Sequence, residues 1–185
     1  AVLKEALLFS KNRKEVYGML GKFAILREDG VAAAPYAQKA LDLGADNDKK
    51  ALHFEYARAL VLTKDFDMAF SELEAAQKLG HDIYAGSLFS FLLVKAVSSD
   101  TKDDRVIEYI DKAVATYPND LNHKLARVLL YEKMGKIEQA KRFLKEVELV
   151  SPGSVERVRN LLLSPNGKHL NSKSYPHMRK NRIVL

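Results

Sequence analysis

The chain of 185 residues carries a net charge of +6, and 47% of its residues are hydrophobic and 29% charged. This balance excludes an intrinsically disordered chain, and the lack of cysteine excludes disulfides, thiolate zinc sites and thiol nucleophiles. No stretch approaches the roughly 18 uncharged apolar residues of a membrane-spanning helix. We therefore expect a soluble protein, and the composition does not choose between cytoplasm and periplasm. Few prolines and glycines beside abundant Ala, Leu, Lys and Glu favour helices.

The predicted elements begin with a short helix in residues 1–13, in which Leu3 and Ala6 share one face. Both residues stand where the second helix of the repeat described next would have them. We interpret this segment as the second helix of a partial preceding repeat. A helix left open at this end would also allow self-association.

Residues 14–154 contain an internal repeat. Three sets of small or apolar residues recur with the same intervals of 36, 37 and 34 residues. The sets are Gly21, Ala57, Val94 and Val128; Ala33, Ala69, Val106 and Ala140; and Ala40, Ala76, Ala113 and Val147. Three sets that share one spacing predict four copies of a single unit. We place the copies at about 14–47, 50–83, 87–120 and 121–154.

Each copy is predicted to form two helices joined by a turn. Apolar residues three and four positions apart, such as Tyr56 and Leu60, lie on one helical face. Glycine, aspartate or serine then interrupts the pattern, and a second periodic run follows. The small residues at fixed positions allow the two helices of a unit to approach closely.

The residues that carry these features resemble the tetratricopeptide repeat (TPR), a 34-residue helix–turn–helix unit. The matching residues are Tyr17, Leu20, Gly21, Ala33 and Ala40; Tyr56, Ala57, Phe66, Ala69, Leu73 and Ala76; Ile110, Ala113 and Pro118; and Tyr131, Gly135, Ala140, Leu144 and Pro152. The resemblance implies an all-α, right-handed superhelical solenoid of antiparallel helix pairs whose first helices line a concave groove. Two residues depart from the pattern. We interpret Pro35 as a first-turn proline of a shortened helix, and Arg127 replaces the usual leucine.

The chain after the repeats is predicted to form a capping helix over residues 155–164, with Ser154 as its N-terminal cap. Residues 165–185 follow as a basic tail without any acid. Its cations are Lys168, Lys173, Arg179, Lys180 and Arg182. Because five of the six net positive charges lie in this tail, the body is nearly neutral, and a high pI alone does not indicate a nucleic-acid-binding fold.

No catalytic constellation is visible. The five histidines have no spacing typical of a metal site, no hydroxyl nucleophile stands beside a base, and no phosphate-binding glycine loop occurs. We interpret His53 as a packing residue, and the run Asp100–Asp104 as a helix start capped by Thr101. The sequence therefore predicts a protein that is not an enzyme and that binds no metal or cofactor.

The resemblance places five residues on the face that the first helices turn toward the groove. These residues are Lys22, Phe54, Arg58, Phe91 and Lys95. Such cations and rings suit a partner peptide with acidic and apolar residues. The alternative is that the cations are merely solvated and the rings belong to the repeat packing. The asparagines with which some TPR proteins clamp a chaperone's terminal carboxylate are missing, so that activity is not implied.

We therefore expect a non-enzymatic scaffold or adaptor that binds a partner peptide or domain in its concave groove, as part of a larger assembly. The alternative function is contact of the basic tail with nucleic acid or an anionic membrane surface, where each phosphate contact would be salt-sensitive.

Overall fold

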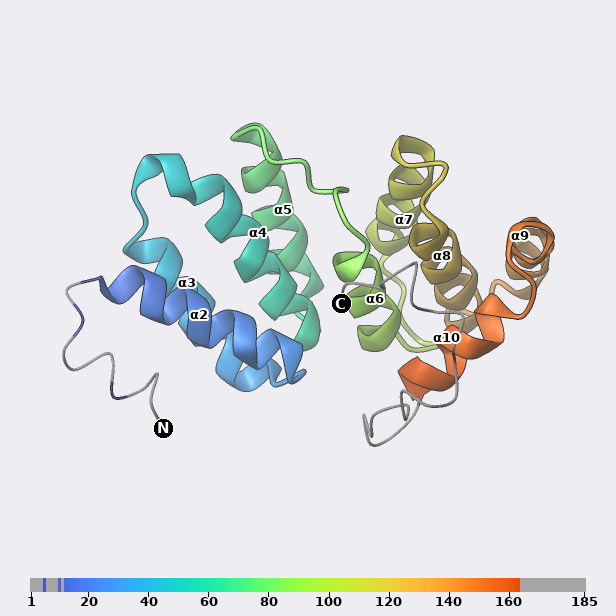
Figure 1. Cartoon of the computed structure of the whole chain (residues 1–185), viewed down its shortest axis with the longest axis horizontal. Coiled ribbons are helices and arrows are strands. Elements are labelled where there is room, and N and C mark those ends of the chain that lie inside the picture. Colours follow the sequence, from blue (N-terminus) through green and yellow to red (C-terminus); the bar gives the residue numbers. More distant parts are fainter. Residues whose placement is uncertain (1–4, 6–9, 11, 164–185) are drawn as a thin grey trace, which may run out of the picture.

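The computed structural model describes residues 5, 10 and 12–163, and all regular secondary structure in these residues is α-helical. The prediction of an all-α chain is therefore confirmed. The helices, drawn in Figure 1, are α2 (Arg13–Leu26), α3 (Gly30–Asp42), α4 (Asp46–Leu62), α5 (Phe66–Lys78), α6 (Leu88–Ala96), α7 (Asp104–Thr116), α8 (Leu121–Lys133), α9 (Ile137–Val150) and α10 (Ser154–Leu163). The segments predicted as a helix in 1–13 and as a basic tail in 165–185 lie wholly or mostly outside the described residues.

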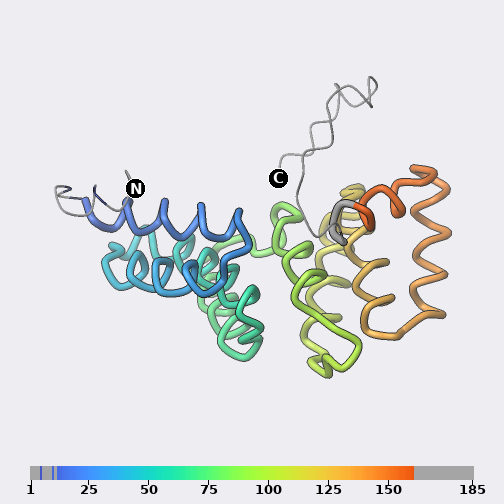
Figure 2. The backbone as a smooth tube through the Cα atoms, turned by 90° about the horizontal axis from the view of Figure 1, so that it is seen from below, coloured from blue at the N-terminus to red at the C-terminus, as the bar shows by residue number. Residues whose placement is uncertain are grey.

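Helices that are adjacent in space form one continuous row, and the remaining helices pack against it. Helices α2, α4, α6, α8 and α10 contact one another in that order, and α3, α5 and α9 each pack on the helix that precedes them. Helices α3, α7 and α9 pack on the helix that follows, and α7 makes no comparable contact with α6, which precedes it. No comparable contacts join α3, α5, α7 and α9 to one another in the described part of the chain. The tube in Figure 2 shows the resulting elongated body, with α2 and α9 at opposite ends.

The same turn recurs between the helices of three pairs. Glu28, Lys64 and Gly135 adopt left-handed backbone conformations, with φ of 59°, 63° and 72°. In each turn the next residue donates its backbone N–H to a carbonyl five positions back, and these bonds are Asp29 to Ala24 (2.9 Å), Asp65 to Leu60 (3.1 Å) and Lys136 to Tyr131 (2.9 Å). Such a bond satisfies a carbonyl that the helix end would leave without a donor. The turns fall at the spacing of the sequence repeat.

The turn between α6 and α7 differs from the other three. The prediction that Thr101 caps the following helix is wrong, because Thr101 Oγ1 instead accepts a hydrogen bond from the backbone N–H of Ser98 at 3.0 Å. Asp103 is the residue that caps α7, and its carboxylate accepts from the N–H of Arg105. Asp103 caps the helix in place of Thr101 because its carboxylate also binds the Arg105 guanidinium, at 2.9 Å.

The small residues of the repeat form the contacts between paired helices. All twelve members of the three repeated sets are buried. The contact between α2 and α3 is close, because a Cβ added to Gly21 would lie 3.3 Å from the backbone nitrogen of Ala37. A larger side chain at this position would hold the two helices apart.

Two local predictions about helix ends are corrected. Pro35 lies inside α3 and not in its first turn. The helix already begins at Gly30, where the Asp29 carboxylate accepts from the N–H of Ala32 at 3.1 Å, and Pro35 has no N–H to donate within it. Ser154 is the first residue of α10, and its buried hydroxyl has no hydrogen-bond partner, so it does not act as the cap.

Among the helices of residues 12–163, none combines the length and the apolar character needed to cross a membrane.

Candidate functional site

The five predicted groove residues all lie on the continuous row of helices. Lys22 belongs to α2, Phe54 and Arg58 belong to α4, and Phe91 and Lys95 belong to α6. They are thus brought to one layer of the molecule from three helices that contact one another in sequence. The exposure and the charge partners of these five residues differ, and the sequence alone did not predict them fully.

Two of the predicted cations share one carboxylate. Arg58 donates from Nη1 to both carboxylate oxygens of Glu55, at 2.9 and 2.8 Å. Lys22 Nζ reaches the same carboxylate from α2, at 3.9 Å from Oε1. Arg58 is only 13% exposed, whereas Lys22 is 60% exposed. Arg58 is therefore a fixed part of this row, and Lys22 is the cation that solvent and a partner can reach.

The third cation is also paired. Lys95, near the end of α6, forms an ion pair with Glu28 in the turn between α2 and α3. The two residues are 67 positions apart, so no local pattern could have indicated the pair. The basic stripe expected from the sequence is therefore corrected to a row of alternating charges, in which Glu28 and Glu55 stand between the cations.

A further lysine, which the sequence reasoning missed, joins this row. Lys133 at the end of α8 donates from Nζ to the carbonyl oxygen of Val94, at 2.6 Å. Burial lowers the pKa of Lys133, and the neighbouring charges of Lys64 and Lys95 lower it further. The three lysines come from α6, α8 and the turn after α4, so positive charge gathers where these helices end.

The two predicted aromatic residues belong mainly to the packing. Phe91 is buried, with 7% of its surface exposed, so it does not line an accessible groove as the sequence analysis expected. Phe54 is half-buried, and its ring lies 4.7 Å from the His81 ring and 6.0 Å from the Phe89 ring. The aromatic part of the expected groove is thus largely replaced by core contacts between α4 and α6.

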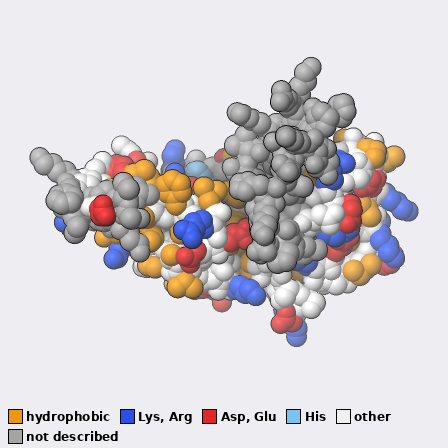
Figure 3. Space-filling view, turned by 60° about the horizontal axis from the view of Figure 1, so that its bottom comes forward, with side chains coloured by type: hydrophobic (Ala, Val, Ile, Leu, Met, Phe, Trp, Pro, Cys, Tyr) orange, Lys and Arg blue, Asp and Glu red, His pale blue; other side chains and the backbone are white. Residues whose placement is uncertain are grey.

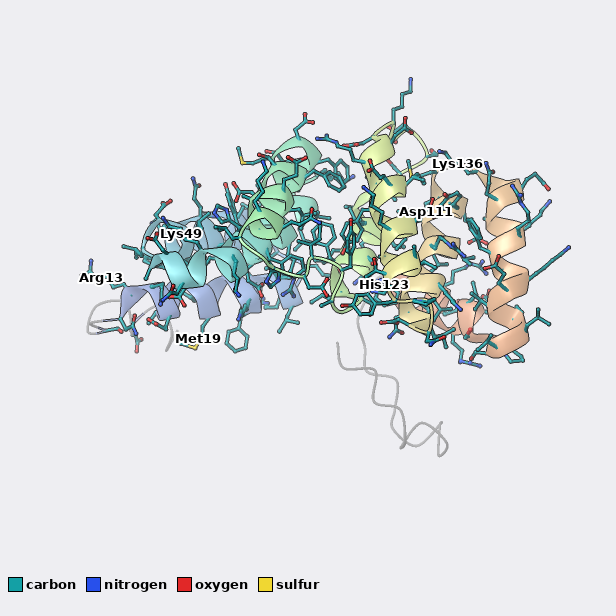
Figure 4. All side chains as sticks on the ribbon, turned by 90° about the horizontal axis from the view of Figure 1, so that it is seen from above. Arg13, Met19, Lys49, Asp111, His123 and Lys136 are labelled. Carbon is teal, nitrogen blue, oxygen red and sulfur yellow. The ribbon has the colours of Figure 1, made fainter. Side chains whose placement is uncertain are left out.

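Exposed apolar residues instead surround Lys22 on α2. Met19, Phe23 and Leu26 are 43%, 55% and 57% exposed. Figure 3 shows hydrophobic side chains gathered over this N-terminal part of the molecule, and Figure 4 shows Met19 pointing away from the body. Their spacing of four and three residues was visible in the sequence. The sequence could not show, however, that this face has no neighbouring helix among the described residues.

The buried histidine joins three segments of the chain through its hydrogen bonds. His123 is fully buried, with Nδ1 2.9 Å from Ser90 Oγ and Nε2 3.1 Å from the Tyr84 carbonyl oxygen. His53 lies half-buried with Nδ1 2.6 Å from Glu72 Oε2. No group of three or more His, Asp or Glu residues in the described chain could hold a metal ion.

Arg127 packs against neighbouring residues although the repeat pattern favours leucine at its position. Its guanidinium carbon lies 3.6 Å from the centre of the Phe143 ring, and Nη2 donates to Glu146 at 3.0 Å. The aliphatic stem is covered while the charge keeps these two partners.

The five cations of the basic tail, Lys168, Lys173, Arg179, Lys180 and Arg182, lie outside the described residues. Comparison of the chain with protein-family models, characterised proteins and solved structures gave no match.

Proposed function

We propose that the chain is a TPR-like solenoid of four helix pairs, α2–α3, α4–α5, α6–α7 and α8–α9, closed by α10. The recurrent left-handed turn at Glu28, Lys64 and Gly135 supports this arrangement, because the same backbone hydrogen bond follows each of these residues at the repeat spacing. The burial of all twelve repeated small residues supports it as well. Each pair buries its apolar face only against its neighbours, as in repeat proteins.

The contacts between helices give this solenoid its inner side. The first helices of successive pairs touch one another, whereas the second helices make no comparable contacts among the described residues. A two-layered array whose layers differ in this way curves toward the layer with the closer spacing. The row of alternating charges thus lies on the concave side.

We infer that this concave side binds a partner protein and that the chain is a non-enzymatic scaffold or adaptor. The observation that carries this function is the charged row of Lys22, Glu55, Arg58, Glu28 and Lys95, which crosses three helices. Glu28 is 52% exposed and Lys95 29% exposed, and ion pairs of such exposure contribute little to stability. An acidic group of a partner can therefore replace Glu28 beside Lys95 at small cost.

The charges of the row also indicate which partner would bind. Lys64, Lys95 and Lys133 lie close to one another, and Glu28 is the acid that pairs with Lys95. This end of the row therefore attracts a carboxylate. A partner segment with acidic residues beside apolar ones is the chemistry that suits the site.

Affinity capture from a lysate of the source cell, with quantitative mass spectrometry, tests the function. The test variant is Lys22→Glu/Lys95→Glu, which reverses the two cations that are more exposed than Arg58 and leaves Arg58 in place. The matched control is Lys78→Glu/Lys141→Glu, which changes the same charge on α5 and α9. A partner that the test variant loses and the control variant retains supports the proposal. Identical captured sets from both variants contradict it.

The basic tail supports a second, separate proposal of contact with nucleic acid or anionic membranes, on its charge alone. Removal of residues 166–185 abolishes such binding and leaves capture by the charged row intact.

A further inference from the structure

Lys133 completes the hydrogen bonding at the end of α6. In a longer helix the carbonyl oxygen of Val94 would accept from the backbone N–H of Ser98, four residues further on. The helix ends at Ala96, however, and the N–H of Ser98 donates to Thr101 Oγ1 at 3.0 Å. Lys133 Nζ supplies a donor from α8 instead, at 2.6 Å from the Val94 oxygen. The ammonium group is thus held in place by a neutral acceptor and not by an acid.

The charges that act on this ammonium group are positive. Lys133 is half-buried, and burial together with Lys64 and Lys95 lowers its pKa. The acid nearest in this arrangement, Glu28, forms its ion pair with Lys95. Lys133 therefore differs from exposed lysines of the described chain that have a carboxylate beside them, such as Lys112, which is paired with Glu108.

A lysine in such surroundings is suited to act as a nucleophile. Only the neutral amine has the lone pair that attacks a carbonyl carbon, and an ordinary lysine is protonated at neutral pH. Desolvation and neighbouring cations both favour the neutral amine. The bond from Lys133 to the Val94 oxygen uses one N–H, and the neutral amine retains two. The loss of a proton therefore leaves this bond intact and frees a lone pair.

The two neighbouring cations indicate the class of reagent. Lys64 is exposed and Lys95 is 29% exposed, so an anion in solvent can reach both. An acyl phosphate carries its negative charge on the group that leaves. Lysines beside the amine would attract this reagent and stabilise the departing phosphate. The exposed pair of Lys95 with Glu28 opposes this only weakly.

We propose that Lys133 is a modification site that takes an acyl group from an acyl phosphate. The amine nitrogen forms a bond to the acyl carbon and releases a proton to water. The bond from that carbon to the phosphate oxygen breaks, and its electron pair leaves with the phosphate. The product amide is uncharged and keeps one N–H for the Val94 oxygen, so the fold is retained while the row loses a cation. On the function proposed above, on which this consequence rests, the modification weakens the binding of an acidic partner.

Incubation of the intact chain with acetyl phosphate, followed by digestion and quantitative mass spectrometry, tests this site. The comparison residue is Lys141 of α9, which is 61% exposed and has Glu138 beside it at 2.8 Å. At about pH 7.5 we expect the acetylation of Lys133 to be at least about threefold faster than that of Lys141. Exposure alone predicts the opposite order, because Lys141 is the more accessible residue. A rate at Lys133 equal to or below that at Lys141 overturns the proposal.

A pair of variants tests the role of the two cations. Lys64→Gln/Lys95→Gln removes them and should slow the acetylation of Lys133 about threefold. Lys50→Gln/Lys78→Gln is the matched control, since it removes the same charge from exposed positions of α4 and α5 and should leave the rate unchanged. Circular dichroism verifies that both variants remain folded. An equal rate at Lys133 in the two variants overturns the proposal.

A second pair of variants separates this inference from the proposed function. Lys133→Arg keeps the charge, whereas Lys133→Gln is uncharged like the acylated side chain. The captured partner should be lost by Lys133→Gln and retained by Lys133→Arg. Equal capture by both, with Lys133 acetylated as expected, overturns the link to partner binding and leaves the modification site standing. A lack of selective acetylation, with capture that depends on Lys22 and Lys95, overturns the modification site and leaves the proposed function standing.

Discussion

The buried imidazole of His123 offers a direct test of how α8 is joined to α6 and to the connection between α5 and α6. It ties three segments: its own helix α8, Ser90 in α6, and Tyr84 in the connection between α5 and α6. A carbonyl oxygen can only accept, so Nε2 carries the hydrogen that Tyr84 receives, and Nδ1 accepts from the Ser90 hydroxyl. The ring is also stacked with Tyr117, with centroids 6.1 Å apart.

The replacement His123→Phe keeps the ring and most of its volume while it removes both hydrogen bonds. The part-buried Tyr84 carbonyl then loses its donor, which costs about 1–3 kcal/mol, whereas the Ser90 hydroxyl can rotate toward another acceptor. We expect a loss of about 2 kcal/mol in the free energy of unfolding. For a chain of this length that corresponds to a fall of about 4–8 °C in Tm.

The same residue makes the stability depend on pH. Burial lowers the pKa of His123 below its ordinary value of 6.5, so the unfolded chain binds a proton that the folded chain does not. This contribution is complete above pH 6.5 and is lost as the pH falls toward the folded-state pKa. Burial also lowers the pKa of His81, which adds a dependence of the same sign. His123→Phe should therefore reduce, and not abolish, the slope of stability below pH 6.5.

Urea unfolding followed by circular dichroism, at intervals from pH 5 to pH 8, measures both effects. Hydrogen exchange of residues 79–87 provides a local measurement, because the tie to Tyr84 lies in this connection. Ser90→Ala serves as the matched control, since it removes one bond and leaves the Tyr84 carbonyl satisfied. A variant within about 0.5 kcal/mol of the parent chain, the size of an ordinary surface substitution, with an unchanged pH slope would refute the assignment of His123 as a structural tie.

Four further replacements test the packing and the turns in thermal or urea unfolding. Lys64→Gly should raise the free energy of unfolding by about 0.5–1 kcal/mol, and Gly135→Ala should lower it by about 1 kcal/mol. Both positions adopt left-handed backbone conformations, which disfavour side chains. Equal effects of the same sign would contradict this reasoning. Gly30→Ala should cost about 1–3 kcal/mol, since its Cβ would meet Leu62 at 2.8 Å, and a neutral result would mean that α3 and α4 can separate freely. Arg127→Leu should be neutral or stabilising by up to about 1 kcal/mol, because a paired charge that is 12% exposed gives way to an apolar chain, and a large loss would show that the guanidinium is essential.

The helices and the turns between them could be predicted from the sequence because their signals are local. The spacing of three and four residues between apolar side chains fixes which face of a helix is buried. Turn residues such as Gly135 interrupt the pattern within a few positions. The small residues of the repeated sets indicated close helix contacts, and each of them is buried. The cap of α7 was predicted wrongly, since neighbouring polar residues compete for the same helix start, and the start of α3 was placed too close to Pro35.

The candidate site depended on tertiary structure, because its properties arise from residues far apart in the chain. The pair of Lys95 with Glu28 turned a basic stripe into an alternating row. Packing placed Phe91 in the core, whereas Phe23 lies on the surface. Periodicity gives the face of a helix on which a residue lies, but not which helix covers that face. The charge and apolar character available to a partner are therefore decided by how the helices pack, since packing determines which side chains lose contact with water and which acids reach the cations.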